Sequence, residues 1–458
     1  MPKNCAFFDE CQSTACVRIR HTGECLCRKH FVKNIERRAA DAIERYHMLA
    51  PATTAETGEA RPEHWIIGMS GGKDSQALAH VLLAIYGNAN ARVRFSGLYI
   101  DVGVTGNHYT DESREIVERT CARLGIPCVV VDVKQEYGVD MDDFHVLSQC
   151  KKGAKRAECS SCGILKRYLI NREAARMGGD KVATGHHLTD ESNMLLNNFF
   201  NVSVEQMARA QPWEKVAVAG AASADSVLLP RVKPFLEVTE EETTMYVRYA
   251  ELEYVATQCP YATNATTSAL KKHMIALEMD RPGTMLRMVR GYHESFLPVL
   301  RPANAAALQA AAAAKKEKQQ QQKQQQQGQE GEEKGTEEAA EAPASGVKLN
   351  ACTKCGCLTV VPVCAFCKII EQANEYKQQH PELFDAASAK RHRCGICMPG
   401  GEQPKSVEDL VRPAAAAHST VPAGAALEPV GTVTKRLRDG AAEEGADEGE
   451  SAPAAKKH

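Results

Sequence analysis

The stretch GMSGGKDSQ (residues 68–76) lies between an apolar run and an amphipathic segment. The run HWIIGM (64–69) predicts a buried strand, and QALAHVLLAIYG (76–87) carries apolar residues at helical spacing. A glycine-rich turn between a strand and a helix directs backbone N–H groups and the helix N-terminus at an anion. The stretch therefore predicts a phosphate-binding loop.

This loop differs from the usual nucleotide P-loop, which has four residues between its glycines and a Ser or Thr after its Lys. Here three residues separate Gly68 from Gly72, and Asp74 follows Lys73. SGGKDS instead resembles the signature of the PP-loop ATP pyrophosphatases. The resemblance implies a loop that holds pyrophosphate while ATP is cleaved between its α- and β-phosphates. It assigns nucleotide binding to Ser70, Gly71, Gly72, Lys73, Asp74 and Ser75.

Strand-like and helix-like segments alternate from about residue 62 to 300. Beyond the loop, strands are predicted at 92–104, 126–133 and 181–187, and helices at 111–125 and 193–201. This alternation predicts an α/β fold with a doubly wound parallel sheet. We expect an N-terminal Cys/His unit with a helix (1–50), a catalytic domain (60–302), a low-complexity linker (303–346), a C-terminal zinc ribbon (347–378) and a mostly disordered tail (379–458).

Composition limits the classes of protein that this chain can be. Its 458 residues carry a net charge of -2, which excludes the global basic field of a nonspecific nucleic-acid binder. Apolar runs are too short to span a membrane, and the first residues resemble neither a secretion nor an import signal, so we expect a cytoplasmic protein. Cytoplasmic thiols stay reduced, so the CxxC pairs among the 18 cysteines indicate metal binding. We interpret the scattered Cys121, Cys128 and Cys150 as small buried apolar residues.

One cysteine group has the spacing C-x2-C-x8-C-x2-C, which can close a tetrahedral site around one ion. This spacing predicts a structural Zn²⁺ bound by Cys352, Cys355, Cys364 and Cys367. The pair Cys394 and Cys397 lies further on and has no assigned role.

A second CxxC pair, Cys159 and Cys162, stands at the start of a predicted helix, where we expect the helix dipole to lower the thiol pKa. The surrounding residues 151–180 carry eight Lys or Arg against three acids. Such a local excess suits a phosphate backbone, although a solvated helix face has the same pattern.

Several motifs together resemble one family. They are SGGKDS, CSSCG (159–163), KRYLIN (166–171), ATGHHLTDE (183–191), RVKPF (231–235) and the final cysteine group. In this order and spacing they resemble the TtuA type of tRNA-uridine 2-sulfurtransferase, which is related to TtcA and to the cytosolic wobble-uridine thiolation enzymes. The resemblance covers residues 1–300 and 350–372.

The resemblance implies an ATP-dependent enzyme that replaces the C2 oxygen of a tRNA uridine with sulfur, giving 2-thiouridine at position 54 or at the wobble position 34. The implied cofactors are ATP with Mg²⁺, a [4Fe–4S] cluster and two Zn²⁺. The implied partners are tRNA, a thiocarboxylated ubiquitin-like sulfur carrier and a second copy of the chain. The alternatives are another PP-loop ligase or amidotransferase, and a non-catalytic tRNA-binding subunit.

The family's functional residues can be placed on this sequence. The resemblance assigns the cluster to Cys159, Cys162 and Cys259, the reacting uridine and ATP to Lys166 and Asp190, and further nucleotide contacts to Asp101, Thr184, Gly185 and His186. From the residues alone, the CxxC pair could be a redox dithiol, Lys166 a surface lysine and Asp190 a helix N-terminal acid. The chain departs from the family at His187, where Asn is usual, and at Thr189, where an acid is usual.

The N-terminal cysteines supply the second zinc site. By resemblance its ligands are Cys5, Cys11, Cys27 and His30, the last two being a C-x2-H pair. Cys16 and Cys25 are competing candidates for this site. Four protein ligands leave no open position on a zinc ion, so we expect both zinc modules to be structural.

Overall fold

The computed structural model describes residues 4–7, 11–50, 61–87, 92–150, 158–208, 216–217, 227–261, 268–300 and 350–384. All of them belong to one compact unit, residues 1–401. The predicted linker, the tail beyond residue 384 and the pair Cys394 and Cys397 lie outside the described residues. Within the described part, every helix is too short or too polar to cross a membrane.

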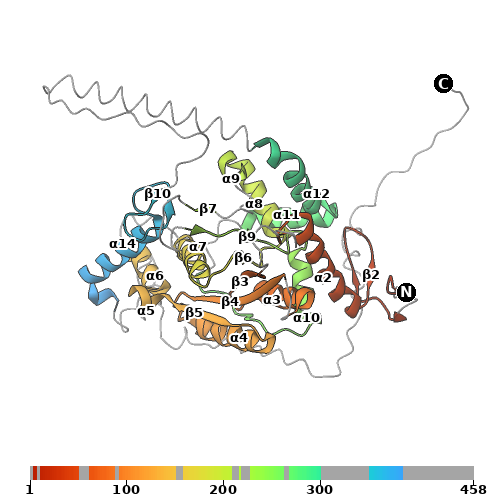
Figure 1. Ribbon diagram of the computed structural model, residues 1–458, viewed down its shortest axis with the longest axis horizontal. Coiled ribbons are helices and arrows are strands. Elements are labelled where there is room, and N and C mark those ends of the chain that lie inside the picture. Colours follow the sequence, from red (N-terminus) through yellow and green to blue (C-terminus); the bar gives the residue numbers. More distant parts are fainter. Residues whose placement is uncertain are drawn as a thin grey trace, which may run out of the picture. The chain divides into compact units, whose positions relative to one another are not determined.

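A five-stranded parallel sheet forms the centre of this unit (Figure 1). Its strands are β3 (Glu63–Met69), β4 (Val93–Asp101), β5 (Cys128–Asp132), β6 (Lys181–Ala183) and β9 (Arg231–Val232). Their spatial order is β5-β4-β3-β6-β9, and every neighbouring pair is parallel. The predicted fold class is confirmed.

The chain leaves β3 toward β4 on one side and later returns to β6 on the other side. The strand order therefore reverses between β3 and β6. In doubly wound sheets, ligands bind at the carboxyl edge beside such a reversal, because the loops after the two strands separate there. The fold thus points to the loops that follow Met69 and Ala183.

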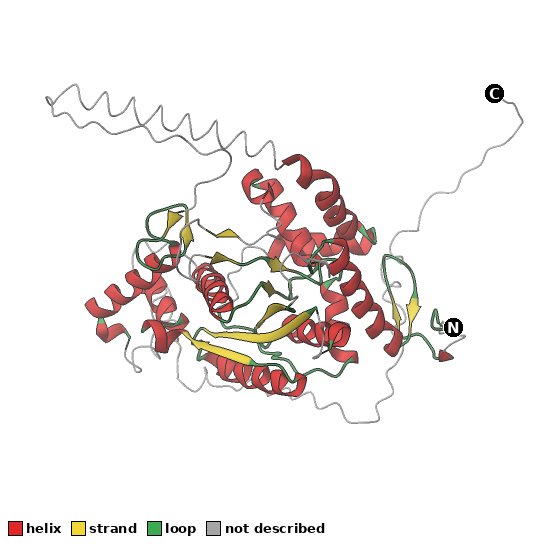
Figure 2. Cartoon of the chain, in the orientation of Figure 1, coloured by secondary structure: helices red, strands yellow, loops and turns green. Residues whose placement is uncertain are grey.

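Helices lie on both faces of the sheet (Figure 2). Alternate residues of β3 enter different core clusters: Trp65 and Ile67 pack on one face, and Ile66 packs on the other. The helices are α2 (Arg28–Arg45), α3 (Lys73–Tyr86), α4 (Tyr109–Leu124), α5 (Val133–Tyr137), α6 (Met141–Cys150), α7 (Glu158–Arg176), α8 (Leu188–Phe200), α9 (Val204–Ala208), α10 (Glu240–Tyr249), α11 (Ser268–Asp280), α12 (Thr284–Gly291) and α14 (Ala365–Gln379).

Shorter elements complete the described part. Three two-stranded antiparallel pairs are β1 (Val17–Arg18) with β2 (Cys25–Leu26), β7 (Val216–Ala217) with β8 (Val227–Leu228), and β10 (Asn350–Ala351) with β11 (Leu358–Thr359). Two 3₁₀ turns span Gly106–His108 and Pro381–Leu383, and a π-helical turn spans Tyr292–Phe296.

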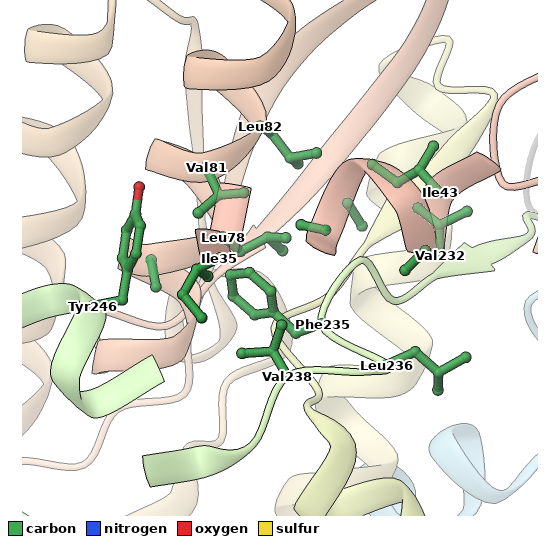
Figure 3. Close-up of a cluster of buried hydrophobic side chains, with 14 of the residues drawn as sticks. Ile35, Ile43, Leu78, Val81, Leu82, Val232, Phe235, Leu236, Val238 and Tyr246 are labelled. Atoms are coloured by element: carbon green, nitrogen blue, oxygen red, sulfur yellow. The ribbon is translucent and has the colours of Figure 1, made fainter. Parts of the chain in front are cut away.

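The core on the α3 face joins segments that are far apart in sequence (Figure 3). Ile35 of α2, Leu78 of α3, Phe235 after β9 and Tyr246 of α10 are all buried in it. Helix α3, which follows the phosphate loop, is therefore packed against α2, the segment after β9 and α10.

A buried ion pair links α2 to α10. Arg38 lies 2.5 Å from a carboxylate oxygen of Glu242, and each side chain is only 10% exposed. Arg38 also donates to the backbone oxygen of Glu237. Burial raises the pKa of Glu242, but the Arg38 guanidinium outweighs it and the net shift is downward. The pair is therefore charged, and either partner left alone would be a buried, uncompensated charge.

Replacing Arg38 by Met should lower the free energy of unfolding by about 3 kcal/mol, because Glu242 is left buried and unpaired. Urea denaturation followed by circular dichroism measures this. Arg37→Met is the matched control, since Arg37 is 64% exposed and pairs with Asp41 at the surface. Its effect should stay within about 0.5 kcal/mol. Equal effects of the two substitutions would contradict a structural role for the buried pair.

Candidate active site

The phosphate loop has the predicted strand–turn–helix geometry. Gly72 is the N-cap of α3, and Gly71 has a φ of 75°, in the left-handed region. A Cβ on Gly71 would lie 3.0 Å from the backbone of Ser113 on α4, so the position also lacks room. The Ser75 hydroxyl accepts from the backbone N–H of Ser70 at 3.2 Å and donates to the Gly72 oxygen at 2.9 Å. The loop is therefore shaped by its own side chains before any ligand binds.

The second turn at the reversal follows β6. That strand ends at Ala183, so the prediction of a strand through His187 was wrong for the last four residues. A Cβ on Gly185 would lie 2.8 Å from the backbone oxygen of Asp74. Only glycine fits at this position, because the backbone of residue 185 packs directly against the first turn of α3. The two turns that flank the reversal are thus in contact.

His186, predicted in the same turn, faces Thr184: its Nδ1 lies 2.9 Å from the threonine hydroxyl. Burial lowers the pKa of His186. Asp101 ends β4, the neighbour of β3, at the same carboxyl edge. Its carboxylate accepts from the Gly103 N–H at 2.9 Å, and burial raises the pKa of Asp101. The predicted residues of the nucleotide site therefore sit on the turns and strand ends of one edge.

A chain of alternating charges runs across this edge. The Lys73 Nζ lies 2.8 Å from both carboxylate oxygens of Asp74 and 3.5 Å from Glu240. The Lys271 Nζ lies 2.9 Å from Glu240 and 3.3 Å from Asp190. Burial raises the pKa of Glu240, but Lys271 and Lys73 outweigh it and keep the carboxyl charged. Two cations are thus held beside the phosphate loop.

Sequence reasoning missed Glu240 and Lys271. Glu240 follows Thr239, which caps α10, so the only sequence signal was a helix start. Lys271 gave no signal, because its partners are distant in sequence. Thr189, which replaces the family's usual acid, accepts a hydrogen bond from the Glu240 N–H at 3.1 Å. Thr243 donates to Asp74 at 2.7 Å. Thr189 therefore fixes the backbone at Glu240, and Thr243 orients the carboxylate of Asp74.

His187 lies between two of the carboxylates. Its Nδ1 accepts from the Asp190 N–H at 3.3 Å as the N-cap of α8, and its Nε2 lies 3.4 Å from the Asp190 carboxylate and 4.0 Å from that of Asp74. Burial lowers the pKa of His187 below its usual 6.5, and the two carboxylates offset this only in part. A neutral imidazole therefore donates toward Asp190.

The three predicted cysteines come together on a second part of the structure. Cys159, Cys162 and Lys166 lie on one face of α7, at spacings of three and four residues. Cys259 is on the loop after α10, and the Cys159 Sγ lies 3.4 Å from the Tyr261 backbone oxygen two residues on. Burial raises the pKa of Cys159, and Cys162 and Cys259 raise it further. Our prediction of a lowered thiol pKa was therefore wrong for Cys159.

Lys166 lies near the same thiols and affects the pKa of one of them. Burial raises the pKa of Cys259, and a backbone hydrogen bond from Tyr261 and the charge of Lys166 offset this only in part. In the described residues, the groups of three or more ligand atoms within 4.8 Å of one another do not include this trio. The charges of Cys162 and Cys259 both raise the pKa of Cys159, so the three thiols lie near one another.

Two other groups have the spacing of single-ion sites. Their ligand atoms lie within 4.8 Å of one another, and they are Cys5, Cys11, Cys27 with His30, and Cys352, Cys355, Cys364 with Cys367. The competing Cys16 and Cys25 are in neither group. Backbone N–H groups outweigh burial and lower the pKa of Cys352 to about 6. Both predicted ligand sets are therefore arranged to hold a metal ion.

The structure differs from the sequence-based interpretation of the basic stretch 151–180 and of the scattered cysteines. Arg172, counted in the basic stretch 151–180, is buried and pairs with Glu136 at 2.6 Å, so it cannot meet a phosphate backbone. Residues 151–157 of that stretch are outside the described part. Of the scattered cysteines, Cys121 is buried as predicted, whereas Cys128 and Cys150 are half-buried.

Gly185→Ala should weaken the binding of an ATP analogue by at least about tenfold, because the new Cβ displaces the first turn of α3. Isothermal titration calorimetry measures this. Gly291→Ala is the control, since a Cβ there meets nothing within 4 Å. Unchanged nucleotide affinity in Gly185→Ala would show that the contact between the turns is not part of the nucleotide site.

The lowered pKa of His187 makes stability depend on pH. Below pH 6.5 the unfolded chain binds a proton at His187 that the folded chain resists, so folding stability falls as the pH drops. In His187→Asn the urea midpoint should fall less between pH 7.5 and 5.5 than in the wild type. His108→Asn, at an exposed site, should retain the full wild-type dependence. Equal pH dependence in all three proteins would contradict this assignment.

Comparisons with known proteins agree with this geometry. The family model described as a PP-loop domain matches residues 39–276. The tRNA-5-methyluridine(54) 2-sulfurtransferase of Pyrococcus horikoshii is 33% identical over 62% of this chain and 80% of its own length. The tRNA 2-thiolation protein NcsA of Haloferax volcanii is 30% identical over 79% of this chain and 98% of its own length.

A eukaryotic relative and a solved structure are also similar. The cytoplasmic tRNA 2-thiolation protein 1 of Chlamydomonas reinhardtii is 30% identical over 68% of this chain and 72% of its own length. The U34-tRNA thiolase NcsA of Methanococcus maripaludis, solved with its [4Fe–4S] cluster, has a TM-score of 0.49 and 22% identity over 63% of this chain and 86% of its own. By its PP-loop domain and its sequence relatives, the chain belongs to the PP-loop family of tRNA 2-thiolation enzymes.

Proposed function

We propose that this tRNA 2-thiolation enzyme adenylates a tRNA uridine in the nucleotide site and receives sulfur at Cys159, Cys162 and Cys259. One observation carries this proposal. The Val255 N–H donates to the Gly71 oxygen at 2.9 Å, and Cys259 follows four residues later. Four residues span at most about 14 Å, so one short segment joins the phosphate loop to the third cysteine.

In the first step the uridine O2 attacks the α-phosphorus of ATP, and pyrophosphate leaves into the loop at residues 70–75. The N-terminus of α3 and the ammonium groups of Lys73 and Lys271 stabilise the charge on the departing pyrophosphate. Asp190 orients Lys271 and stands beside the neutral His187. Adenylation is needed because the C2 oxygen is otherwise a poor leaving group.

In the second step a sulfur nucleophile forms a bond to C2, and AMP leaves with the former O2. When sulfur arrives as the thiocarboxylate of a ubiquitin-like carrier, water then cleaves the acyl–sulfur bond and returns a carboxylate. Lys166, one turn from Cys162 on α7, would stabilise negative charge on the incoming sulfur or on the base when sulfur adds to C2.

The cysteine trio suits an iron–sulfur cluster, because thiolates are the usual ligands of such clusters and the effect of Cys162 and Cys259 on the pKa of Cys159 shows that the three thiols are near one another. A [4Fe–4S] cluster held by Cys159, Cys162 and Cys259 would supply one iron without a protein ligand, as a place for sulfur to bind. The three cysteines come from two segments, the start of α7 and the loop after α10.

The remaining cofactors are proposed from donor chemistry. Thiolate and imidazole groups suit Zn²⁺, so we assign one ion to each four-ligand group. Each would stabilise its small module, one at residues 1–50 and one at 347–378, by up to ~10–16 kcal/mol. Mg²⁺ would accompany ATP, with carboxylate oxygens available on Asp74, Asp190 and Glu240.

The partners follow from the same chemistry. The proposed substrate is tRNA, thiolated at position 54 or at the wobble position 34. The name of the relative from Pyrococcus horikoshii supports position 54. A second copy of the chain and a cytoplasmic location complete the proposal, the latter supported by the relative from Chlamydomonas reinhardtii.

The decisive experiment is nucleoside mass spectrometry of tRNA from cells that lack this protein. We expect one 2-thiouridine species to disappear and to return with the wild-type gene, but not with Cys159→Ala or Asp190→Asn. Cys16→Ala, an exposed cysteine outside every ligand group, should restore it fully. Mapping the lost species to position 54 or 34 identifies the target.

Persistence of every 2-thiouridine species in deletion cells with no second thiolation enzyme would overturn the proposed reaction. If Cys159→Ala restored 2-thiouridine, the proposed role of the cysteine trio would be wrong, but the proposed reaction would stand.

A further inference from the structure

Helix α6 (Met141–Cys150) has no role in the reaction as described, yet its side chains touch both segments that carry the cysteine trio. The first contact is to the loop of Cys259. The Tyr261 hydroxyl donates to one carboxylate oxygen of Asp142 at 2.6 Å. The other oxygen accepts from the Thr105 hydroxyl at 2.5 Å. Asp142 is buried, so these contacts are shielded from water.

Tyr261 makes contacts through three separate groups. Besides its hydroxyl bond to Asp142, its ring stacks on His145 of α6, with the centroids 4.7 Å apart and the planes 26° apart. Its backbone oxygen lies 3.4 Å from the Cys159 Sγ. Because Tyr261 is two residues after Cys259, these contacts fix the loop on the far side of the cysteine from Val255. Cys259 is therefore held between two anchors.

The second contact of α6 is to the start of α7. The His145 Nδ1 lies 2.9 Å from a carboxylate oxygen of Glu158, and the Ser148 hydroxyl donates to the same oxygen at 2.8 Å. Glu158 immediately precedes Cys159. One helix thus sets the position of α7's first turn and of the Cys259 loop at the same time.

Helix α14 of the C-terminal cysteine module also contacts α6 and the residues just before it. Lys377 of α14 lies 2.8 Å from Asp143 and donates to the Gly138 oxygen at 3.0 Å. Asp140, just before α6, pairs with Lys134 at 2.6 Å. Ion pairs from Lys134 and Lys377 therefore fix the start of α6, which makes it a firm support for Tyr261.

We propose that Asp142 and Tyr261 are positioning residues that hold Cys259 beside Cys159 and Cys162, so that the trio meets its cluster as a preorganised set. The proposal rests on the cluster proposed above. A loop anchored on only one side of Cys259 would have to be ordered when the cluster binds, and that entropic cost would weaken retention of the cluster. Asp142 and Tyr261 are outside the proposed ligand and nucleotide residues, and their contacts described above are to Thr105, His145 and Cys159, so the role assigned to them is to position the cysteines.

The test is Tyr261→Phe, which removes one hydroxyl and keeps the ring on His145. The full-length variant should unfold at the wild-type temperature as apoprotein. After anaerobic reconstitution with iron and sulfide, its visible cluster absorbance should decay about tenfold faster in an iron chelator. Tyr254→Phe is the matched control, since it removes a partly exposed hydroxyl from the same loop, and it should decay like the wild type.

A double-mutant cycle separates the hydroxyl bond from general damage. If Tyr261 and Asp142 act through one bond, Asp142→Ala with Tyr261→Phe should lose iron no faster than Asp142→Ala alone. Additive effects, or a decay in Tyr261→Phe equal to that of the wild type, would overturn the proposal. Cys159→Ala separately reports on the cluster: if its cluster absorbance after reconstitution equals that of the wild type, the proposed cluster itself is wrong, and not only the positioning role of Asp142 and Tyr261.

Discussion

The contact between Gly185 and the backbone of Asp74 is the constraint on which the candidate active site depends. It exists because β6 lies beside β3 while the chain has already gone to the other side of the sheet. The two turns at this reversal can then meet, and each brings polar groups to one edge. Residues from α3, α8, α10 and α11 come together in the site only because these two turns are in contact.

The charges at this edge are balanced within the protein. Lys73 and Lys271 alternate with Asp74, Glu240 and Asp190. Bringing two ammonium groups together without such partners would cost energy through repulsion and desolvation. The carboxylates keep both lysines charged and placed, so phosphate oxygens meet donors that need little rearrangement. Preorganised donors of this kind are the main source of electrostatic catalysis.

Features that are encoded by a local sequence pattern could be predicted from the sequence. The phosphate loop, the alternating strands and helices, and the C-terminal cysteine spacing depend on neighbours in sequence, so their geometry could be predicted. Cys259 and Cys11 could be assigned only by resemblance, because their partners come from distant segments. Glu240 and Lys271 were missed for the same reason: nothing around Lys271 distinguishes it from a surface lysine. Arg172 was misjudged because charge alone does not show that a side chain turns inward.

The bond between Val255 and Gly71 limits how far an activated base has to travel. The phosphate loop and Cys259 are joined by a four-residue segment, so the two proposed half-reactions are separated by about 14 Å at most along this segment. An adenylated base is open to attack by water, and a transfer between distant sites would expose it. In the proposed reaction the tRNA would stay bound while both bonds are exchanged, so that one binding event would serve activation and sulfur insertion. The hydrogen bond between Val255 and Gly71 would thus keep the two proposed half-reactions within one substrate-binding event.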